Sequence, residues 1–294
     1  MNIINRLFYY GFILPISRLP FSALYFFSDV LYILFYYVAR YRKKVIRGNI
    51  RRSFPDKTEQ EWIPIEKEFY RHFCDLILES LKVFTISAKQ VHQRMKIRNP
   101  ELANQFFNEG RSIIIAGGHY NNWELFAVAI DEAIKHQAKG IYKPLSNKYF
   151  DRKMQATRSK YGLELVHHRK VKESFEADKD KPTATIFAID QSPTQHAPPL
   201  WMNFLNQETA VLTGTEKYAR RYNYPVVFGR IHKIKRGHYE FEMELVCENP
   251  AGTEEGEVTI MTTRMLERDI QQVPAYWLWS HRRWKHKRSV EVVS

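Results

Sequence analysis

The sequence has few cysteines, no recognisable nucleophile motif and no repeats. Cys74 and Cys247 are its only cysteines among 294 residues, so a disulfide framework is excluded and both side chains are expected to be reduced thiols. There is no G-x-S-x-G motif and no other recognisable motif around a serine or cysteine nucleophile. Low-complexity linkers and internal repeats are also absent, so the length predicts one sizeable domain with an ample core.

Acidic residues are in short supply relative to basic ones. The chain has 32 Asp and Glu against 45 Lys and Arg, a formal net charge of +13 at pH 7. This excess predicts an anionic partner, and charge alone leaves three classes open: lipid head groups, an acidic carrier protein or a nucleic acid. The histidine pairs at 167–168 and at 232 and 238 lack metal-ligand spacing with nearby carboxylates or thiols, so we expect no metal and no redox cofactor.

One long hydrophobic run is present, from Pro20 to Ala39. It is about as long as a helix that crosses a hydrocarbon core, and a cluster of basic residues follows it within residues 40–52. By the positive-inside rule, the chain beyond it faces the cytoplasm. We therefore interpret residues 1–52 as a membrane anchor with a basic juxtamembrane segment, and residues 53–294 as a single domain.

How this segment meets the membrane stays open. Asp29 lies near the middle of the run and is costly in a full span, and residues 7–17 are also apolar. A hairpin or a helix lying in the interface is therefore an alternative to a span. A buried helix of a soluble protein with a solvated basic face is the remaining one. A cleavable signal peptide fits poorly, because a stop-transfer cluster follows the apolar run instead of a small-residue site.

Beyond this segment, helical and strand patterns alternate. Helical patterns cover residues 59–97, 121–136, 147–161, 214–222 and 256–271, and strand patterns cover residues 113–116, 140–142, 163–166, 183–189, 225–231 and 239–245. Alternation of this kind predicts an α/β sandwich with a mainly parallel central sheet flanked by helices, and with an antiparallel element late in the chain. Because ligands bind at the carboxyl ends of parallel strands, His119, Lys143 and Asp190, each just past a predicted strand, indicate a site.

The most informative stretch is the turn around His119. Gly117 and Gly118 permit a sharp strand-to-helix turn, and Glu124 follows in the first turn of the predicted helix, which Asn121 or Asn122 could cap. A carboxylate that accepts one ring N–H would fix the tautomer and make the other nitrogen a better base. A structural hydrogen bond at a helix start is the alternative. A base without a protein nucleophile favours direct attack by a substrate hydroxyl.

The chain resembles a known family in an ordered set of motifs. The spacing His-x-x-x-x-Glu after a glycine pair is similar to the signature of glycerolipid-type acyltransferases. More narrowly, the chain resembles the lipid A late (lauroyl or myristoyl) acyltransferases of Gram-negative bacteria. The resemblance runs over residues 15–288 and rests on four further blocks: residues 40–55, Tyr142 to Arg152, Asp190 to Thr215, and Tyr276 to Lys285.

The resemblance implies a role for each matched residue. His119 would be the general base and Glu124 its orienter. Lys143 stands in place of the family's arginine, near the acyl carbonyl or a lipid phosphate, with the same charge but without bidentate geometry. Asp190 would shape the site, or would simply cap the following turn. The other implied substrate-binding residues are Asn147, Gly214, and the pair Arg282 and Arg283, which would bind a phosphate or clamp the C-terminus through surface pairs.

The resemblance also implies the reaction and the partners. An acyl chain would pass from a thioester, carried by acyl carrier protein or less favourably by coenzyme A, to a hydroxyl of an anionic membrane lipid, a lipid A precursor. Backbone N–H groups near Gly117 and Gly118, or Lys143, would stabilise the developing negative charge. A lysophospholipid or an aminolipid is the alternative acceptor. A non-enzymatic membrane protein that binds nucleic acid or lipid through basic patches such as residues 281–288 is the alternative class, and we expect no nucleic-acid partner.

Overall fold

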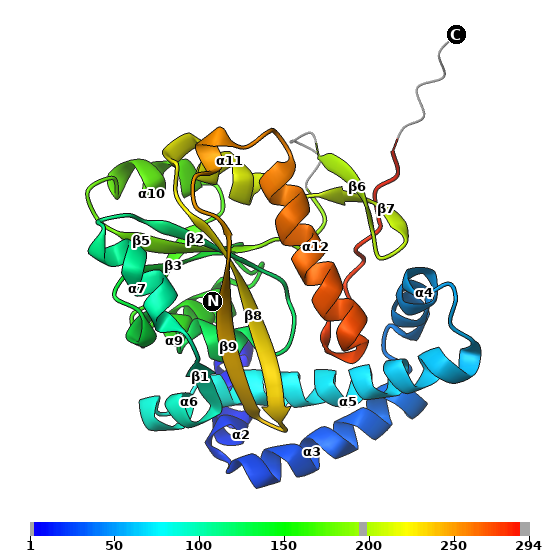
Figure 1. Ribbon diagram of the computed structural model, residues 1–294. Helices are drawn as coiled ribbons and strands as arrows, with labels where there is room; N and C mark the ends of the chain where they lie inside the picture. The colour runs from blue at the N-terminus through cyan, green and yellow to red at the C-terminus, as the bar shows by residue number, and fades with distance from the viewer. Residues whose placement is uncertain (1–2, 194–198, 289–294) are drawn as a thin grey trace.

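The computed structural model describes residues 3–193 and 199–288, and its centre is a seven-stranded sheet (Figure 1). The strand order is β1-β9-β8-β2-β5-β3-β4, and every neighbouring pair is parallel except β8 and β9. The predicted α/β architecture with a mainly parallel sheet is confirmed. The strand bounds are β1 Met95–Ile97, β2 Ile113–Gly117, β3 Gln137–Tyr142, β4 Glu164–His167, β5 Thr183–Ala188, β8 Val226–Lys235 and β9 His238–Cys247.

Helices cover both faces of the sheet (Figure 1). Their bounds are α5 Glu59–Val83, α6 Ala88–Arg94, α7 Pro100–Asn108, α8 Trp123–Ala127, α9 Lys148–Arg158, α10 Val171–Ala177, α11 Gly214–Tyr222 and α12 Glu257–Gln272. In β2, Ile114 and Ala116 join one core with α10, α11 and α12, whereas Ile113 and Ile115 join the other core with α6, α7 and α8. A strand buried on both faces needs an unbroken apolar run, which residues 113–116 provide.

The helix expected over residues 121–136 is much shorter in the structure. Helix α8 has only five residues, and the chain then makes a 3-10 turn, Asp131–Ala133. The carboxylate of Asp131 accepts the backbone N–H of Ala138 at 2.8 Å. This bond turns the chain into β3, which begins at Gln137 and so before the expected strand start.

A hairpin outside the main sheet was not expected from the sequence. Strands β6 (Leu200–Phe204) and β7 (Gln207–Val211) pair antiparallel. The two residues between them, Leu205 and Asn206, have φ angles of 49° and 58°. Two consecutive positive φ angles are typical of a tight hairpin turn.

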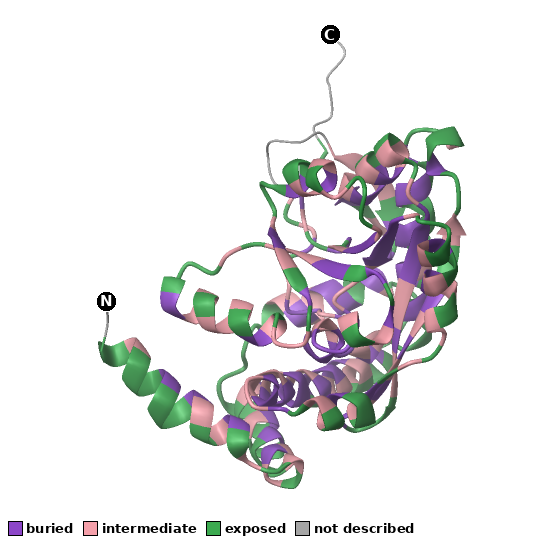
Figure 2. Cartoon of the chain, turned by 90° about the vertical axis from the view of Figure 1, so that its left-hand side faces the viewer, coloured by how far each residue is buried: buried purple, intermediate pink, exposed green. Residues whose placement is uncertain are grey.

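The N-terminal region forms a layer of helices, and those within residues 14–53 lie against α5 (Figure 1). Its elements are α1 Ile3–Phe8, a π-helical turn Tyr9–Ile13, α2 Leu14–Arg18, α3 Phe21–Ile33, a second π-helical turn Leu34–Val38, and α4 Lys43–Ser53. The stretch Phe21–Val38 is long and apolar enough to cross a membrane by length and composition, and only 22% of it is buried. Figure 2 shows the large exposed share of the N-terminal helices.

Helix α3 is nevertheless attached to the domain by polar bonds. The hydroxyl of Ser28 donates to Asp75 at 2.7 Å, and the hydroxyl of Tyr25 donates to Glu79 at 2.9 Å, both carboxylates belonging to α5. Asp29 forms an ion pair with Arg236, from the turn between β8 and β9, at 2.6 Å. The polar residue in the middle of the apolar run therefore faces a cation of the domain.

Candidate active site

The strand β2 ends in the glycine turn that the sequence singled out. A Cβ atom at Gly118 would lie 2.6 Å from Cδ1 of Leu266, on α12, so a side chain there would displace the Leu266 side chain. A Cβ atom at Gly117 would lie 3.1 Å from the carbonyl oxygen of Gly229. The two glycines let the chain pass between α12 and β8, and they place His119 at the carboxyl edge of the sheet.

His119 is held by Asp190, which follows the adjacent strand β5. Nδ1 of His119 lies 2.7 Å from Oδ1 of Asp190, and the backbone N–H of His119 donates to Oδ2 at 2.7 Å. The indole N–H of Trp277 also donates to Oδ2, at 2.9 Å. Asp190 is only 5% exposed. The carboxylate thus accepts three hydrogen bonds away from water, which fixes both the ring and the turn that carries it.

The electrostatics of this pair favour an ionised carboxylate beside a basic imidazole. Burial alone would raise the pKa of Asp190, but the charge of His119 and the hydrogen bonds from its ring, Trp277 and the His119 backbone lower that pKa to about 2. Burial lowers the pKa of His119, whereas Asp190 and then Glu124 raise it, so that the pKa of His119 lies above its ordinary value. The pair therefore has the arrangement of a base and its orienting acid.

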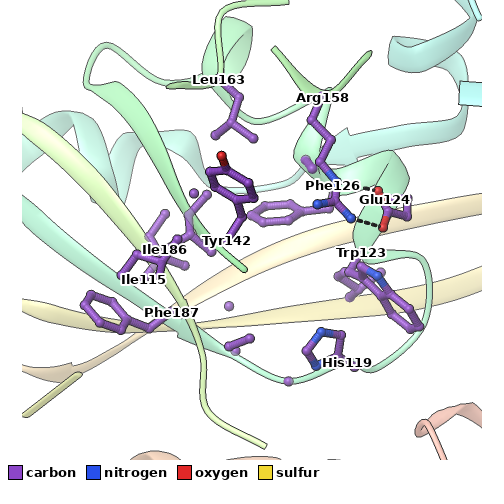
Figure 3. Close-up of a pocket in the computed structure, with 18 of the residues that line it drawn as sticks. Ile115, His119, Trp123, Glu124, Phe126, Tyr142, Arg158, Leu163, Ile186 and Phe187 are labelled. Atoms are coloured by element: carbon purple, nitrogen blue, oxygen red, sulfur yellow. Dashed lines mark hydrogen bonds and ion pairs between the residues drawn. The ribbon is translucent and has the colours of Figure 1, made fainter. Parts of the chain in front are cut away.

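The expectation that Glu124 accepts the ring N–H of His119 is wrong, because Asp190 is the carboxylate at Nδ1. Glu124 instead forms a two-point ion pair with Arg158, the last residue of α9, with Nε 2.9 Å from Oε2 and NH2 bonded to Oε1 (Figure 3). Burial lowers the pKa of Arg158, but the hydrogen bond and the charge of Glu124 raise it more, so the pKa lies above its ordinary value. Glu124 acts on His119 only through its charge, because Asp190 occupies the hydrogen-bonding position.

A cavity of about 170 Å³ opens beside His119 (Figure 3). Its wall is mostly apolar and comes from the sheet, α8 and the segment before β4, with His119, Glu124 and Arg158 as its charged members. The labelled apolar lining residues are Ile115, Trp123, Phe126, Tyr142, Leu163, Ile186 and Phe187. A mainly apolar cavity with a few convergent polar groups is the usual form of a small-molecule or lipid site.

The free ring nitrogen of His119 has no strong partner that would block it. The side-chain amide nitrogen of Gln191 lies 3.4 Å from Nε2, and the ring of Trp123 packs edge-on at 5.1 Å between centroids. The side chain of His119 is 17% exposed, so the nitrogen can meet a substrate. Within residues 3–193 and 199–288, no group of three or more His, Cys, Asp and Glu side chains is placed to hold a metal ion.

Comparison with known proteins gives the family. A family model described as bacterial lipid A biosynthesis acyltransferase matches residues 2–286. The chain belongs to this family. Its members are acyltransferases of lipid A biosynthesis and are membrane-associated. None of the curated proteins matches the chain.

Of the eight site residues predicted from the sequence of this lipid A acyltransferase, only His119 and Glu124 line the cavity. Lys143 is exposed just after β3. Asn147 is the N-cap of α9, where its Oδ1 accepts the backbone N–H of Tyr149 at 3.0 Å, and its amide also bonds with Asn5 of α1. Asn147 therefore joins α9 to the N-terminal layer, and its role as a substrate-binding residue stays a prediction.

The remaining predicted residues are Gly214, Arg282 and Arg283, and none of them lines the cavity. Gly214 begins α11, and a Cβ atom there would lie 3.6 Å from the ring of Phe187, a wall residue. Arg282 is exposed, whereas Arg283 is only 2% exposed. Burial lowers the pKa of Arg283 to about 10, although Asp190 raises it, and its Nε has no hydrogen-bond partner within the part of the chain that the structure describes.

Sequence reasoning missed Arg158 and Trp277 as site residues. Arg158 lies 34 positions from Glu124, at the end of a helix whose polar surface gives no sign of a buried partner. Trp277 was noted only as part of a resembling block. No local signal pointed to either residue, because each contact joins segments that only the folded sheet brings together.

Proposed function

We propose that this protein moves a fatty acyl chain from the thioester of an acyl carrier protein to a hydroxyl of a lipid A precursor. Family membership supports acyl transfer in lipid A biosynthesis. The buried pair of His119 and Asp190 at one end of an apolar cavity supports base catalysis most directly. The donor, the acceptor hydroxyl and the roles of individual residues are the parts we propose.

Nε2 of His119 removes the proton of the acceptor hydroxyl. The hydroxyl oxygen forms a bond to the thioester carbonyl carbon as the proton moves to Nε2, which yields a tetrahedral intermediate. Collapse of this intermediate breaks the carbon–sulfur bond, and the leaving thiolate takes the proton from Nε2. Asp190 accepts the Nδ1–H bond throughout, so it holds the productive tautomer and stabilises the imidazolium.

The oxyanion of the intermediate needs a donor in the cavity wall. The backbone N–H of His119 already donates to Asp190, so it is not free for this purpose. Arg158 and Gly118 are both lining residues of the cavity, and we assign the charge stabilisation to the Arg158 guanidinium and the Gly118 amide. One donor of this kind is worth about 3 kcal/mol in the transition state. Glu124 would hold the guanidinium in place by its two-point bond.

The surface around the site fits an acidic carrier protein. Lys143 follows β3, and His168 and Arg169 follow β4, at the same carboxyl edge as His119. The backbone N–H of His168 donates to the carbonyl oxygen of Tyr142 at 2.9 Å, so His168 lies beside the residue that precedes Lys143. The net charge of +13 adds to the attraction. A carrier protein is favoured over coenzyme A because it presents an extended acidic surface.

We further propose that the N-terminal helices lie in the interface of the inner membrane and that the domain faces the cytoplasm. The middle of helix α3 is bonded to the domain, through Tyr25, Ser28 and Asp29. A full span would separate these pairs and leave their charged partners unpaired. The opposite face of α3 exposes large apolar side chains that suit the headgroup boundary, among them Phe26 at 65% and Ile33 at 54% exposure.

Mass spectrometry of lipid A and of the polar lipids tests the function. Cells that lack the protein are complemented with wild type or with His119→Ala. We expect the loss of one secondary acyl chain from lipid A, restored only by the wild type. Intact lipid A with a missing phospholipid or aminolipid species would keep the chemistry and move it to another acceptor. No change in any acylated lipid would refute acyl transfer.

A further inference from the structure

One buried carboxylate outside the cavity contacts three separate parts of the fold. Glu79 lies on α5 and is 4% exposed. Its Oε2 accepts the side-chain amide of Asn122 at 2.6 Å and the hydroxyl of Tyr239, on β9, at 2.8 Å. Its Oε1 accepts the hydroxyl of Tyr25, on α3, at 2.9 Å. The mechanism above uses none of these groups.

Asn122 is the residue through which Glu79 reaches the site. Its Oδ1 accepts the backbone N–H of Leu125 at 2.8 Å and so caps α8, while its Nδ2 donates to Glu79. Helix α8 has only five residues, and a helix of this length has no stability of its own. Trp123 and Glu124 are its first two residues, and they contact His119 and Arg158. The geometry of the site therefore depends on this cap.

A carboxylate is the group best able to fix the direction of that amide. It accepts hydrogen bonds and donates none when ionised, so it can pair only with the NH2 end of Asn122. The oxygen end then points to Leu125, as capping requires. An apolar residue in place of Glu79 would avoid the cost of a buried charge but would leave the amide free to turn.

We propose that Glu79 is a positioning residue for the acyl-transfer site: it orients the Asn122 amide that caps α8, and through Tyr25 it joins α8 to the bilayer-facing helix α3. This inference rests on the proposed function for its catalytic consequence. Its structural part, the order of α8, does not depend on which reaction the protein performs.

Two measurements on the purified full-length protein in detergent or vesicles test the proposal. Hydrogen exchange over residues 120–128 reports the order of α8, and kcat and KM for transfer from an acyl carrier protein thioester report the site. In Glu79→Ala we expect exchange of the Leu125 amide about 5–30 times faster, the effect of a lost cap. We expect kcat to fall by about tenfold or more, with KM for the donor little changed.

Two further variants separate positioning from general stability. Glu66→Ala removes another fully buried carboxylate of α5, one that pairs with Arg47 and Lys43 far from α8 in the chain. It should lower the melting temperature but leave exchange at 120–128 and kcat unchanged. Glu79→Gln should stay within about threefold of wild type in kcat, because its oxygen can accept from Asn122 and Tyr239 while its amide donates to Tyr25.

An exchanged pair keeps the test decisive if Glu79→Ala fails to fold. Asn122→Asp alone places two carboxylates, which both only accept hydrogen bonds, against each other, and it should disorder α8. When Asn122→Asp is combined with Glu79→Gln, the new amide at position 79 donates to the new carboxylate at position 122. This double variant should recover the order of α8 and most of kcat. Equal effects of Glu79→Ala and Glu66→Ala, or no recovery in the double variant, would overturn the proposal. A wild type that transfers no acyl group, with the expected exchange pattern, would refute the proposed function but support the positioning role.

Discussion

Nδ1 of His119 and Oδ1 of Asp190 lie 2.7 Å apart although the residues are 71 positions apart in the chain. They meet because β2 and β5 are parallel neighbours, so the turns that follow both strands leave the sheet at the same edge. The proposed base and its orienting carboxylate are therefore joined by the register of two strands, and the pair forms only when the sheet does.

Asp190→Asn should leave the fold intact and reduce kcat by about 10²–10⁴-fold, because an amide can hold the wrong tautomer and cannot stabilise an imidazolium. Burial lowers the pKa of His119 and Asp190 raises it, to a net increase. The base must be neutral, so kcat/KM should rise with pH through this pKa, and in the variant the rising limb should move to lower pH. A pH–rate profile measures this, and an unmoved limb would contradict the pairing.

Arg158→Lys keeps the charge but not the two-point bond to Glu124, and we expect kcat to fall about tenfold. Arg158→Ala removes the cation and should cost about 10²–10³-fold. Single-turnover rates with preloaded acyl carrier protein isolate the chemical step. Arg98→Ala, an exposed arginine that pairs with Glu240 at 3.3 Å, is the matched control and should stay near wild type. Equal rates for Arg158→Ala and the control would remove Arg158 from the mechanism.

Two glycines of the cavity wall should respond differently to an added methyl group. A Cβ atom at Gly140 would lie 3.4 Å from Leu163, an ordinary contact, so Gly140→Ala should narrow the cavity without loss of stability. We expect kcat/KM for the longest accepted acyl thioester to fall about tenfold relative to shorter ones. A Cβ atom at Gly229 would lie 2.6 Å from the Phe241 ring, so Gly229→Ala should cost about 1–3 kcal/mol of unfolding free energy.

Acyl thioesters that differ by two carbons, together with denaturant unfolding, measure both effects. An unchanged chain-length preference in Gly140→Ala would show that the acyl chain lies elsewhere. Similar unfolding free energies for the two variants would contradict the wall geometry described for Gly229.

The membrane face of α3 can be tested with charge. Phe26→Glu and Val30→Glu change residues that are 65% and 50% exposed, and each should weaken vesicle binding by about tenfold, since insertion of such a side chain is worth about 1.5–3 kcal/mol. Ile260→Glu, at a 41% exposed position on α12, is the control and should leave binding unchanged. Flotation with anionic vesicles measures the affinity. Equal losses in all three variants would place the membrane contact elsewhere.

The sheet and the edge that carries the site could be predicted from the sequence, because both depend on local patterns. Each apolar strand, such as residues 113–116, can be recognised from its own local sequence. The polar residues that follow such strands must gather at one edge of a parallel sheet. His119 and Asp190 were found in this way. The antiparallel strand β9 could also be predicted, since its outward glutamates alternate with apolar residues.

The partner of His119 could not be predicted, because strand order is a property of the whole fold. Glu124 is close in sequence and was therefore the natural candidate, but the neighbour of β2 in space is β5. The short length of α8 could not be predicted for a similar reason. Residues 128–136 continue the helical pattern, and the bond from Ala138 to Asp131 that ends it crosses a turn without a signature of its own.

The contact of Trp277 with Asp190 determines when the site is completed during synthesis. Its indole donates the third hydrogen bond to Asp190, from a segment close to the end of the family match at residue 286. A ribosome makes the apolar helices of residues 3–38 long before it makes Trp277. We therefore expect each molecule to reach the membrane during its synthesis and to become active only after Trp277 has been made, so that a chain interrupted before Trp277 is attached but inert.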